Sequence, residues 1–211
     1  MKIQLIYLVR HGETDANKLN IYQGRGQDNS LNETGRKQAE LFGKWLKLHK
    51  KACPTPSIIF TSPAKRALET TAIIKNELVG MAKHPEICVL PNLHEINHGK
   101  WEGLSDKRLK KKYPKPYRLW KNKPMKMKFP KGETMKNAKK RILKVWRNKI
   151  LGYKGGHIIV VAHGGVNFQI INDVLESDKL RNVRQDNTCL NIIELPRMRM
   201  ALVNSTAHLF S

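Results

Sequence analysis

The sequence predicts a three-layer α/β fold, in which helices cover both faces of a mostly parallel sheet. Three short runs rich in Ile, Val and Leu, at Ile3–Val9, Ser57–Thr61 and His157–Ala162, are typical of strands buried on both faces. Stretches with helical periodicity follow these runs, and this alternation favours parallel strands joined by crossover helices. The chain has 211 residues, 40% of them hydrophobic, which suits one domain with a sizeable core.

The first half of the chain contains two predicted strand–helix units. Ile3–Val9 ends in a glycine-containing turn, and a polar loop follows. In the helix after that loop, one face consists of four apolar residues, Ala39, Phe42, Trp45 and Leu46. After Ser57–Thr61, the pair Ser62-Pro63 marks the start of a second helix that runs to about Leu78. A third strand is expected at Ile87–Leu90.

An inserted lobe interrupts the alternation. Residues 103–131 are basic, aromatic and interrupted by prolines, so we expect helices and loops there, within a single domain that spans residues 1–211. A long helix is predicted over Glu133–Ile150, and the chain then returns to the sheet with His157–Ala162 and a helix that begins at His163. Two further runs are expected to form a hairpin at the edge of the sheet, Leu190–Leu195 and Met200–Val203.

Positive charge is concentrated in one segment. The chain carries a formal net charge of +23, and residues 107–154 hold 20 Lys and Arg with a single acid, Glu133. The other 163 residues hold 20 basic and 16 acidic side chains. Such a segment indicates an anionic substrate or partner. A lysine-rich face that is only solvated would have the same composition, and the segment contains no recognisable nucleic-acid-binding motif.

The sequence argues against several other classes of protein. No apolar run approaches the roughly 20 residues that a membrane-spanning helix requires. The three cysteines, Cys53, Cys88 and Cys189, are far apart and lack the spacing of disulfide-rich or zinc-binding domains. We therefore expect a protein of the reducing cytoplasm without a structural metal, and the sequence leaves its oligomeric state open.

Basic side chains follow the ends of three predicted strands. Arg10 and His11 follow the first strand, and Arg66 lies about one helical turn beyond the second. His163 follows the strand at His157–Ala162. Because the carboxyl ends of parallel strands form the ligand crevice of an open α/β sheet, we expect the two histidines and two arginines to meet there. Glycines beside both histidines allow close approach of a ligand, and nearby helix N-termini favour an anion, so the cluster indicates a phosphate site.

Five motifs resemble those of the histidine phosphatase superfamily, the phosphoglycerate-mutase-like proteins. The motifs are Leu8-Val9-Arg10-His11-Gly12-Glu13-Thr14, Thr61-Ser62-Pro63-x-x-Arg66-Ala67-x-x-Thr70, Leu93-x-Glu95-x-x-x-Gly99-x-Trp101-Glu102-Gly103, Pro130-x-Gly132-Glu133 and Val161-Ala162-His163-Gly164-Gly165. A lone Arg-His-Gly occurs by chance in many proteins. Five motifs in the order of the family, spread over nearly the whole chain, are far more specific.

The resemblance implies phosphoryl transfer through a phosphohistidine. His11 would attack phosphorus, and Glu95 would protonate the leaving alkoxide. The phosphoryl oxygens would be surrounded by Arg10, Arg66 and His163. Further substrate contacts would come from Asn17, Gln23, Gly24 and Gly164. Neither a metal nor another cofactor is needed if the arginines neutralise the phosphate.

Two of these assignments have alternatives. Glu102 lies seven residues beyond Glu95 and is the other candidate proton donor. The segment Pro130-Lys131-Gly132-Glu133 resembles the small phosphatases of the family, so we favour hydrolysis of phosphomonoesters of small anionic metabolites. A phosphoglycerate-type phosphomutase is one alternative function. A polyanion-binding protein that uses residues 107–154 is another.

The resemblance also places a substrate-shaping lobe directly after the Glu95 motif. We therefore expect part of the basic segment to rim the active-site pocket and to raise the local concentration of anionic substrates. The candidate rim residues are Lys107, Arg108, Lys110, Lys111, Lys112, Lys121, Lys123, Lys126 and Lys128.

Overall fold

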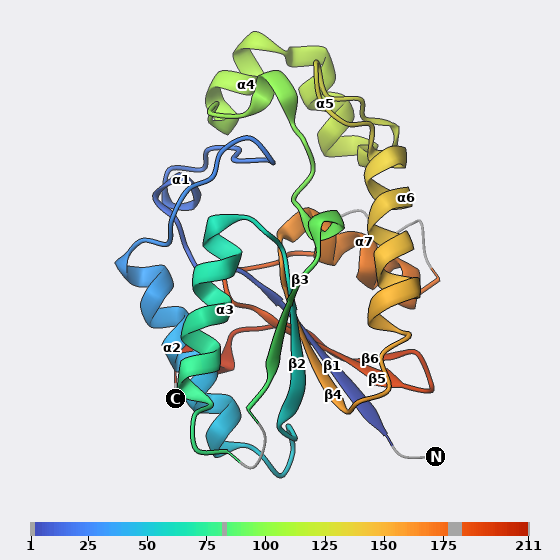
Figure 1. The fold of residues 1–211 in the computed structure, drawn as a ribbon. Coiled ribbons are helices and arrows are strands. Elements are labelled where there is room, and N and C mark those ends of the chain that lie inside the picture. The colour runs from blue at the N-terminus through green and yellow to red at the C-terminus, as the bar shows by residue number, and fades with distance from the viewer. Residues whose placement is uncertain (1–2, 82–83, 177–182, 211) are drawn as a thin grey trace.

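A computed structural model describes residues 3–81, 84–176 and 183–210 of the chain (Figure 1). Its centre is a sheet whose strands lie in the order β3-β2-β4-β1-β5-β6. The strands are β1 (Gln4–Arg10), β2 (Pro56–Thr61), β3 (Glu86–Val89), β4 (His157–Ala162), β5 (Leu190–Leu195) and β6 (Arg199–Ser205). The strands from β3 to β1 are parallel, whereas β5 and β6 pair antiparallel at one edge. The predicted mostly parallel sheet with an edge hairpin is therefore confirmed.

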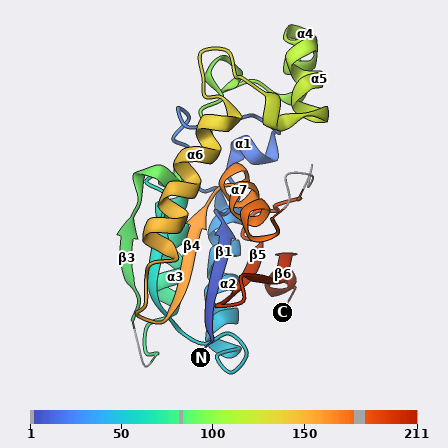
Figure 2. The same cartoon turned by 90° about the vertical axis from the view of Figure 1, so that its right-hand side faces the viewer.

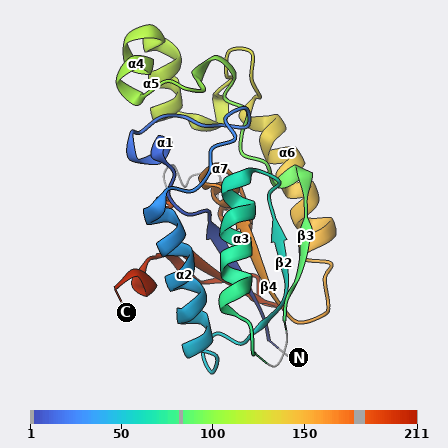
Figure 3. The same cartoon turned by 60° about the vertical axis from the view of Figure 1, so that its left-hand side comes forward.

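Helices cover both faces of the sheet, as the sequence predicts. In the described part of the chain, α2 and α3 pack on one face and α6 and α7 on the other (Figures 1 and 3). Their bounds are α2 (Glu33–Leu48), α3 (Lys65–Glu77), α6 (Met135–Val145) and α7 (Gly164–Val174). Along β1, Tyr7 and Val9 join the core under α2 and α3, whereas Ile6 and Leu8 join the core under α6 and α7.

The apolar stripe predicted for α2 faces the sheet. Three of its members are buried, Ala39, Phe42 and Leu46. Trp45 is half-buried and stacks on His49, with ring centroids 4.5 Å apart. The helix starts where Asn32 Oδ1 accepts a hydrogen bond from the backbone N–H of Gly35 over 2.8 Å, which satisfies one of the free donors of the first turn.

The segment predicted as an inserted lobe stands over the carboxyl ends of the parallel strands (Figures 1 and 2). It contains α4 (Asp106–Lys112) and α5 (Pro114–Asn122). Buried Trp101 packs edge-on against Phe129 with ring centroids 5.3 Å apart, and Leu109 of α4 is buried in the same core as α6. Apolar packing thus fixes the lobe in position above the strand ends.

The helix after the lobe differs from the prediction. The sequence predicts one helix over Glu133–Ile150, whereas α6 begins after its N-cap, Thr134, and ends at Val145. The chain continues as a π-helical turn over Trp146–Ile150, in which Trp146 Nε1 donates to Asp173 Oδ2 over 3.1 Å. Apolar periodicity does not distinguish a wider final turn from a regular one.

The connecting segments also contain short helices. The loop after β1, predicted only as polar, contains α1 (Asp15–Lys18), which is too short to show in an apolar pattern. Turns of 3₁₀ helix lie at Pro91–Leu93, Gly99–Trp101, Pro124–Lys126 and Ala207–Leu209. Within residues 3–81, 84–176 and 183–210, we find no helix with the length and apolar composition that crossing a membrane requires.

Candidate active site

The basic side chains that follow the strand ends lie together at the carboxyl edge of β1, β2 and β4. The last residue of β1 is in register with the last residue of β4, and β2 pairs with β4 almost to the same level. His11 and His163 meet there with ring centroids 5.2 Å apart. Arg66 reaches His11 from the first turn of α3. Arg10, the last residue of β1, completes the cluster.

His11 is buried and its imidazole is held in one orientation. Its Nδ1 lies 2.7 Å from the carbonyl oxygen of Gly12, which can only accept a hydrogen bond, so Nδ1 carries the proton. Nε2 then carries the lone pair and accepts a hydrogen bond from Arg66 Nε over 3.2 Å. Burial, followed by the charges of Arg66 and Arg10, holds the pKa of His11 well below its usual range. His11 is therefore a neutral imidazole with an unprotonated Nε2, which is the state that nucleophilic attack requires.

Arg66 is fixed by acceptors on the loop that precedes α2. The side chain is 2% exposed, and its Nη1 and Nη2 donate to the carbonyl oxygens of Gln27 and Gly24, each over 2.9 Å. The same loop also fixes the first turn of α3, because Asp28 Oδ1 accepts a hydrogen bond from the backbone N–H of Lys65 over 2.7 Å. The guanidinium is thus oriented toward His11 by the fold itself.

His163 follows β4 and is the N-cap of α7. It is fully buried, and its Nε2 lies 2.8 Å from the hydroxyl of Ser62, the residue after β2. Burial, with smaller contributions from Arg66 and His11, holds its pKa well below the usual range. Its buried Nδ1 has no hydrogen-bond partner among the described residues.

The Arg10 side chain is fixed by a hydrogen bond to the C-terminal part of the chain. Its Nη1 donates to the carbonyl oxygen of Gln185 over 2.7 Å, and its buried Nε has no partner among the described residues. Gln185 is itself fixed, because Oε1 accepts from Asn167 and Asn191 over 3.0 and 2.9 Å. A Cβ on Gly164 would lie 3.9 Å from Arg10 Nε, so this glycine lies beside the arginine.

The two candidate proton donors occupy different positions. Glu95 lines the cavity that contains His11, and its carboxylate accepts from the backbone N–H groups of Ile96 and Gly165 over 2.9 and 3.3 Å. The carboxylate of Glu102 accepts from three backbone N–H groups, those of Arg25, Gly26 and His98. Glu102 is therefore occupied in fixing a loop, whereas Glu95 is open to a ligand.

The predicted substrate-binding positions divide into two groups. Asn17, Gln23 and Gly24 line the same cavity as His11, whereas Gly164 lines a neighbouring cavity beside Arg10. Gly24 has a φ of +55°, and a Cβ there would come within 2.1 Å of Glu102 Oε1, so the close turn requires glycine.

The cavity over His11 has a volume of about 850 Å³ and is bounded by the lobe. On the lobe side, Asp106 accepts hydrogen bonds from the hydroxyls of Tyr22 and Tyr117 over 3.0 and 2.6 Å. Lys121 Nζ lies 3.3 Å from the same carboxylate. Burial opposes ionisation of Asp106, but the bond from Tyr117, the charge of Lys121 and the bond from Tyr22 together lower its pKa. This wall therefore presents an ionised Asp106 paired with Lys121.

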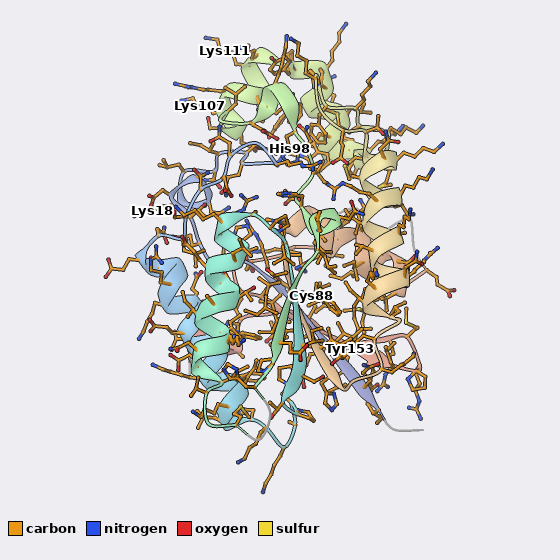
Figure 4. All side chains as sticks on the ribbon, in the orientation of Figure 1. Lys18, Cys88, His98, Lys107, Lys111 and Tyr153 are labelled. Atoms are coloured by element: carbon orange, nitrogen blue, oxygen red, sulfur yellow. The ribbon has the colours of Figure 1, made fainter. Side chains whose placement is uncertain are left out.

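Only part of the expected basic rim faces the cavity. Lys107 and Lys121 line it. The other candidates do not, namely Arg108, Lys110, Lys111, Lys112, Lys123, Lys126 and Lys128, all of which are exposed. Figure 4 shows Lys111, one of these, extending outward from the lobe, above His98. The buried Leu109 sets which side of α4 faces inward, and a run of lysines alone does not reveal that side.

Sequence reasoning missed several residues of the cavity wall, among them Asn187, His98 and Tyr22. Asn187 donates from Nδ2 to the carbonyl oxygen of His11 and to Asn17 Oδ1, over 3.1 and 3.2 Å. His98 also lines the cavity and packs edge-on against Tyr22, with ring centroids 5.4 Å apart. Tyr22 directly precedes the Gln23-Gly24 pair, and this adjacency is the signal that could have identified it.

The site combines the parts that phosphoryl transfer uses. It holds a neutral imidazole, two guanidinium groups and a carboxyl group in one cavity. Among the described residues, no group of three or more His, Cys, Asp or Glu side chains is arranged to hold a metal ion. The positive charge that lines the cavity comes from Arg10, Arg66, Lys107 and Lys121.

Comparison with known proteins agrees with this geometry. The family model described as histidine phosphatase superfamily (branch 1) matches residues 6–207. Phosphoserine phosphatase 1 of Hydrogenobacter thermophilus is 28% identical over 208 residues, which cover 97% of this chain and 93% of that protein. A phosphoglycerate mutase of Schizosaccharomyces pombe is 33% identical over 173 residues, which cover 81% and 79%.

A solved structure shares the fold. The crystal structure of phosphoserine phosphatase from Entamoeba histolytica in complex with 3-phosphoglyceric acid is 25% identical, with a TM-score of 0.80. The match covers 98% of this chain and 99% of that one. The region that the family model matches includes the strand ends and the lobe that form the cavity.

Proposed function

Because this chain belongs to the histidine phosphatase superfamily (branch 1), we propose that it hydrolyses phosphomonoesters of small anionic metabolites through a phosphohistidine at His11, without a metal ion. The observation that carries the proposal is the 2.7 Å contact between His11 Nδ1 and the carbonyl oxygen of Gly12. It leaves Nε2 unprotonated inside the cavity and facing the guanidinium of Arg66. A nucleophile and the charge that stabilises its product are thus adjacent.

In the first half-reaction, His11 Nε2 forms a bond to phosphorus while the bond from phosphorus to the alcohol oxygen breaks. Arg10 and Arg66 stabilise the charge on the non-bridging oxygens. The protonated carboxyl of Glu95 transfers its proton to the leaving oxygen, so the product is a neutral alcohol.

In the second half-reaction, water attacks the phosphohistidine. The Glu95 carboxylate accepts a proton from this water as its oxygen bonds to phosphorus, and the phosphorus–nitrogen bond breaks. Phosphate leaves, Glu95 is again protonated and His11 is again neutral. The arginines supply the positive charge throughout, so these steps require no metal ion.

The charges of the cavity support an anionic substrate. Lys107 and Lys121 lie on the lobe side of the cavity, opposite the strand ends that carry Arg10 and His11. A phosphomonoester with a second anionic group would have cationic partners at both ends. The related phosphoserine phosphatase was solved with 3-phosphoglyceric acid, which carries a phosphate and a carboxylate.

The phosphohistidine provides the direct test. The protein is mixed with a ³²P-labelled phosphomonoester in the presence of EDTA and quenched in base. We expect a label that is stable in base, labile in acid and located on His11, because a phosphoramidate has this stability. His11→Ala should lose the label and several orders of magnitude of turnover. An acid-stable label, or near-normal turnover of the variant, would exclude the mechanism.

A phosphoglycerate-type mutase is the second candidate, because the Schizosaccharomyces pombe relative carries that name. The two functions differ in the acceptor of the phosphoryl group, which is water for a phosphatase and a substrate hydroxyl for a mutase. Phosphate release should therefore exceed isomerisation of a phosphoglycerate, with or without a bisphosphate to prime the enzyme. Isomerisation that outpaces phosphate release would favour the mutase.

A further inference from the structure

The outer surface of the lobe carries a charge that the catalytic cavity does not use. Residues 103–131 contain 12 Lys and Arg but one acid, Asp106. That carboxylate is already occupied by Tyr22, Tyr117 and Lys121. The 11 other cations of the lobe have no carboxylate partner among the described residues. No carboxylate of the described residues therefore offsets their mutual repulsion through an ion pair.

A stripe of lysines extends this surface along α6. Lys136, Lys140 and Lys144 are exposed and have no ion-pair partner in the described structure. Because they are four residues apart, they lie on one side of the helix, with about 6 Å of rise between neighbours. In Figures 1 and 2, α6 runs down from the lobe along one side of the sheet. The cations thus form an elongated track from the lobe to the flank of the molecule.

We propose that this track, made of the exposed lysines and arginines of residues 108–131 other than Lys121, together with Lys136, Lys140 and Lys144, binds the phosphodiester backbone of a nucleic acid without reading its bases. The surface is separate from the catalytic cavity, and the proposal does not depend on the proposed phosphatase activity. Neutralisation of phosphates by lysine and arginine supplies essentially all of the affinity in binding of this kind.

The aromatic side chains of the lobe explain why the binding is independent of sequence. Tyr117 donates its hydroxyl proton to Asp106, and Trp120 Nε1 donates to the hydroxyl of Tyr22 over 3.1 Å. Both side chains, like Tyr113, are only partly exposed. Because no aromatic side chain of the lobe is fully exposed, the surface offers no open platform on which bases could stack.

A membrane surface fits this region less well. The large hydrophobic side chains that are exposed in the described structure all lie outside residues 103–150, so the track has no apolar group to insert among lipids. The cations also follow α6 away from the lobe and are not confined to its tip. A long, narrow polyanion can follow such a track, whereas a flat bilayer would contact only part of it.

The test measures binding of a fluorescein-labelled DNA duplex whose ends carry no phosphate, so that the catalytic cavity has no phosphomonoester to bind. Fluorescence anisotropy over a range of salt concentrations should show saturable binding, with a Kd of about 10⁻⁶ to 10⁻⁴ M near physiological salt. The plot of log K against log salt should have a steep negative slope, about 0.9 per phosphate contacted. A change of duplex sequence should leave both quantities nearly unchanged.

Two triple variants locate the contact. K110Q/K111Q/K112Q on α4 and K136Q/K140Q/K144Q on α6 should each weaken binding at least tenfold at low salt and lower the slope by about 2 to 3. The matched control is K44Q/K50Q/K51Q, which removes the same charge from exposed lysines around the end of α2, far from the lobe. Hydrolysis of p-nitrophenyl phosphate should be unchanged in all three, because none of these residues lines the cavity.

Three results would overturn the proposal. The first is the absence of saturable duplex binding. The second is an equal loss in the α2 control, which would mean that net charge alone governs binding. The third is binding to vesicles that contain phosphatidylserine, without binding to the duplex. If the vesicle binding depended on the α4 and α6 lysines, the surface would be assigned to a membrane.

Discussion

Arg66 Nε donates a hydrogen bond to His11 Nε2 over 3.2 Å, so a single guanidinium is fixed against the nitrogen that would attack phosphorus. The other nitrogens of this guanidinium are held by Gly24 and Gln27. The same orientation would present Arg66 to the phosphoryl oxygens once Nε2 is bonded to phosphorus. Its position is set before a substrate arrives, which is how preorganised charge lowers a barrier.

Arg66→Lys should therefore lower kcat by about 10²- to 10³-fold, although it retains a positive charge. Lysine cannot supply three fixed N–H donors to His11, Gly24 and Gln27 at once. Steady-state kinetics with p-nitrophenyl phosphate measures the loss. Arg36→Lys is the control, because Arg36 is half-exposed and lies 3.5 Å from Glu69, away from the cavity. Comparable effects of both changes would contradict a specific role for the Arg66 guanidinium.

Glu95→Gln should impair substrates with poor leaving groups far more than p-nitrophenyl phosphate. The variant removes the transferable proton and keeps nearly the same shape, and p-nitrophenolate leaves without protonation. Comparison of kcat for an alkyl phosphate and for p-nitrophenyl phosphate measures the difference. An equal loss with both substrates would indicate that Glu95 serves only to hold the backbone N–H groups of Ile96 and Gly165.

Glu102→Gln should act on stability. The Glu102 carboxylate accepts three backbone hydrogen bonds, and each such bond to a charged group is worth about 1.5–3 kcal/mol. The amide replacement keeps one acceptor oxygen, so we expect a loss of about 2–3 kcal/mol in the free energy of unfolding, measured with urea. Activity on the two classes of substrate should fall in parallel. A selective loss with alkyl phosphates would instead identify Glu102 as the proton donor.

The sequence predicts the sheet and the cluster at its edge because both follow from local patterns. Buried strands appear as apolar runs, and the residue after each strand must lie at the carboxyl edge of a parallel sheet. This is enough to bring His11, His163 and Arg66 together. The resemblance to a family then assigns their roles, which the local pattern alone does not do.

The lobe side of the cavity is set by contacts between distant segments. Tyr22 and Asp106 are 84 residues apart, and their hydrogen bond exists only when the loop that contains Tyr22 meets the start of α4. Asn187 reaches His11 across 176 residues. In a sequence, each of these polar residues is indistinguishable from one that is solvated in a loop. Because a sequence does not show which side of a helix faces a distant segment, Lys110 was a candidate for the rim although it does not line the cavity.

His208 should make the fold less stable in mild acid. Its ring is buried beside Phe42, with centroids 5.1 Å apart, and burial lowers its pKa to about 4. In the unfolded chain a histidine titrates near 6.5, so between about pH 6.5 and 4 the unfolded state binds a proton that the folded state does not. The free energy of unfolding therefore decreases as pH falls through this window, by up to about 1.4 kcal/mol per pH unit for this group.

His208→Gln should make that pH dependence shallower, measured by urea unfolding at pH 7 and pH 5. The variant should retain part of the pH dependence, because burial also lowers the pKa values of His11, His98 and His163. His49→Gln, at an exposed position, is the control. The attribution to His208 fails if its variant and the control have the same difference in stability between the two pH values.

Lys121→Gln should reduce affinity for substrates that carry a second anionic group. Lys121 lines the cavity on the lobe side, and Asp106 would still be held by Tyr22 and Tyr117 after the change. We expect KM for phosphoserine or 3-phosphoglycerate to rise about tenfold, equal to about 1.4 kcal/mol, with little change in kcat. KM for p-nitrophenyl phosphate should hardly change, because it has no second anionic group. Lys111→Gln removes the same charge from the outside of the lobe and should have no comparable effect, so an equal rise in KM in that variant would show that Lys121 acts only through overall charge.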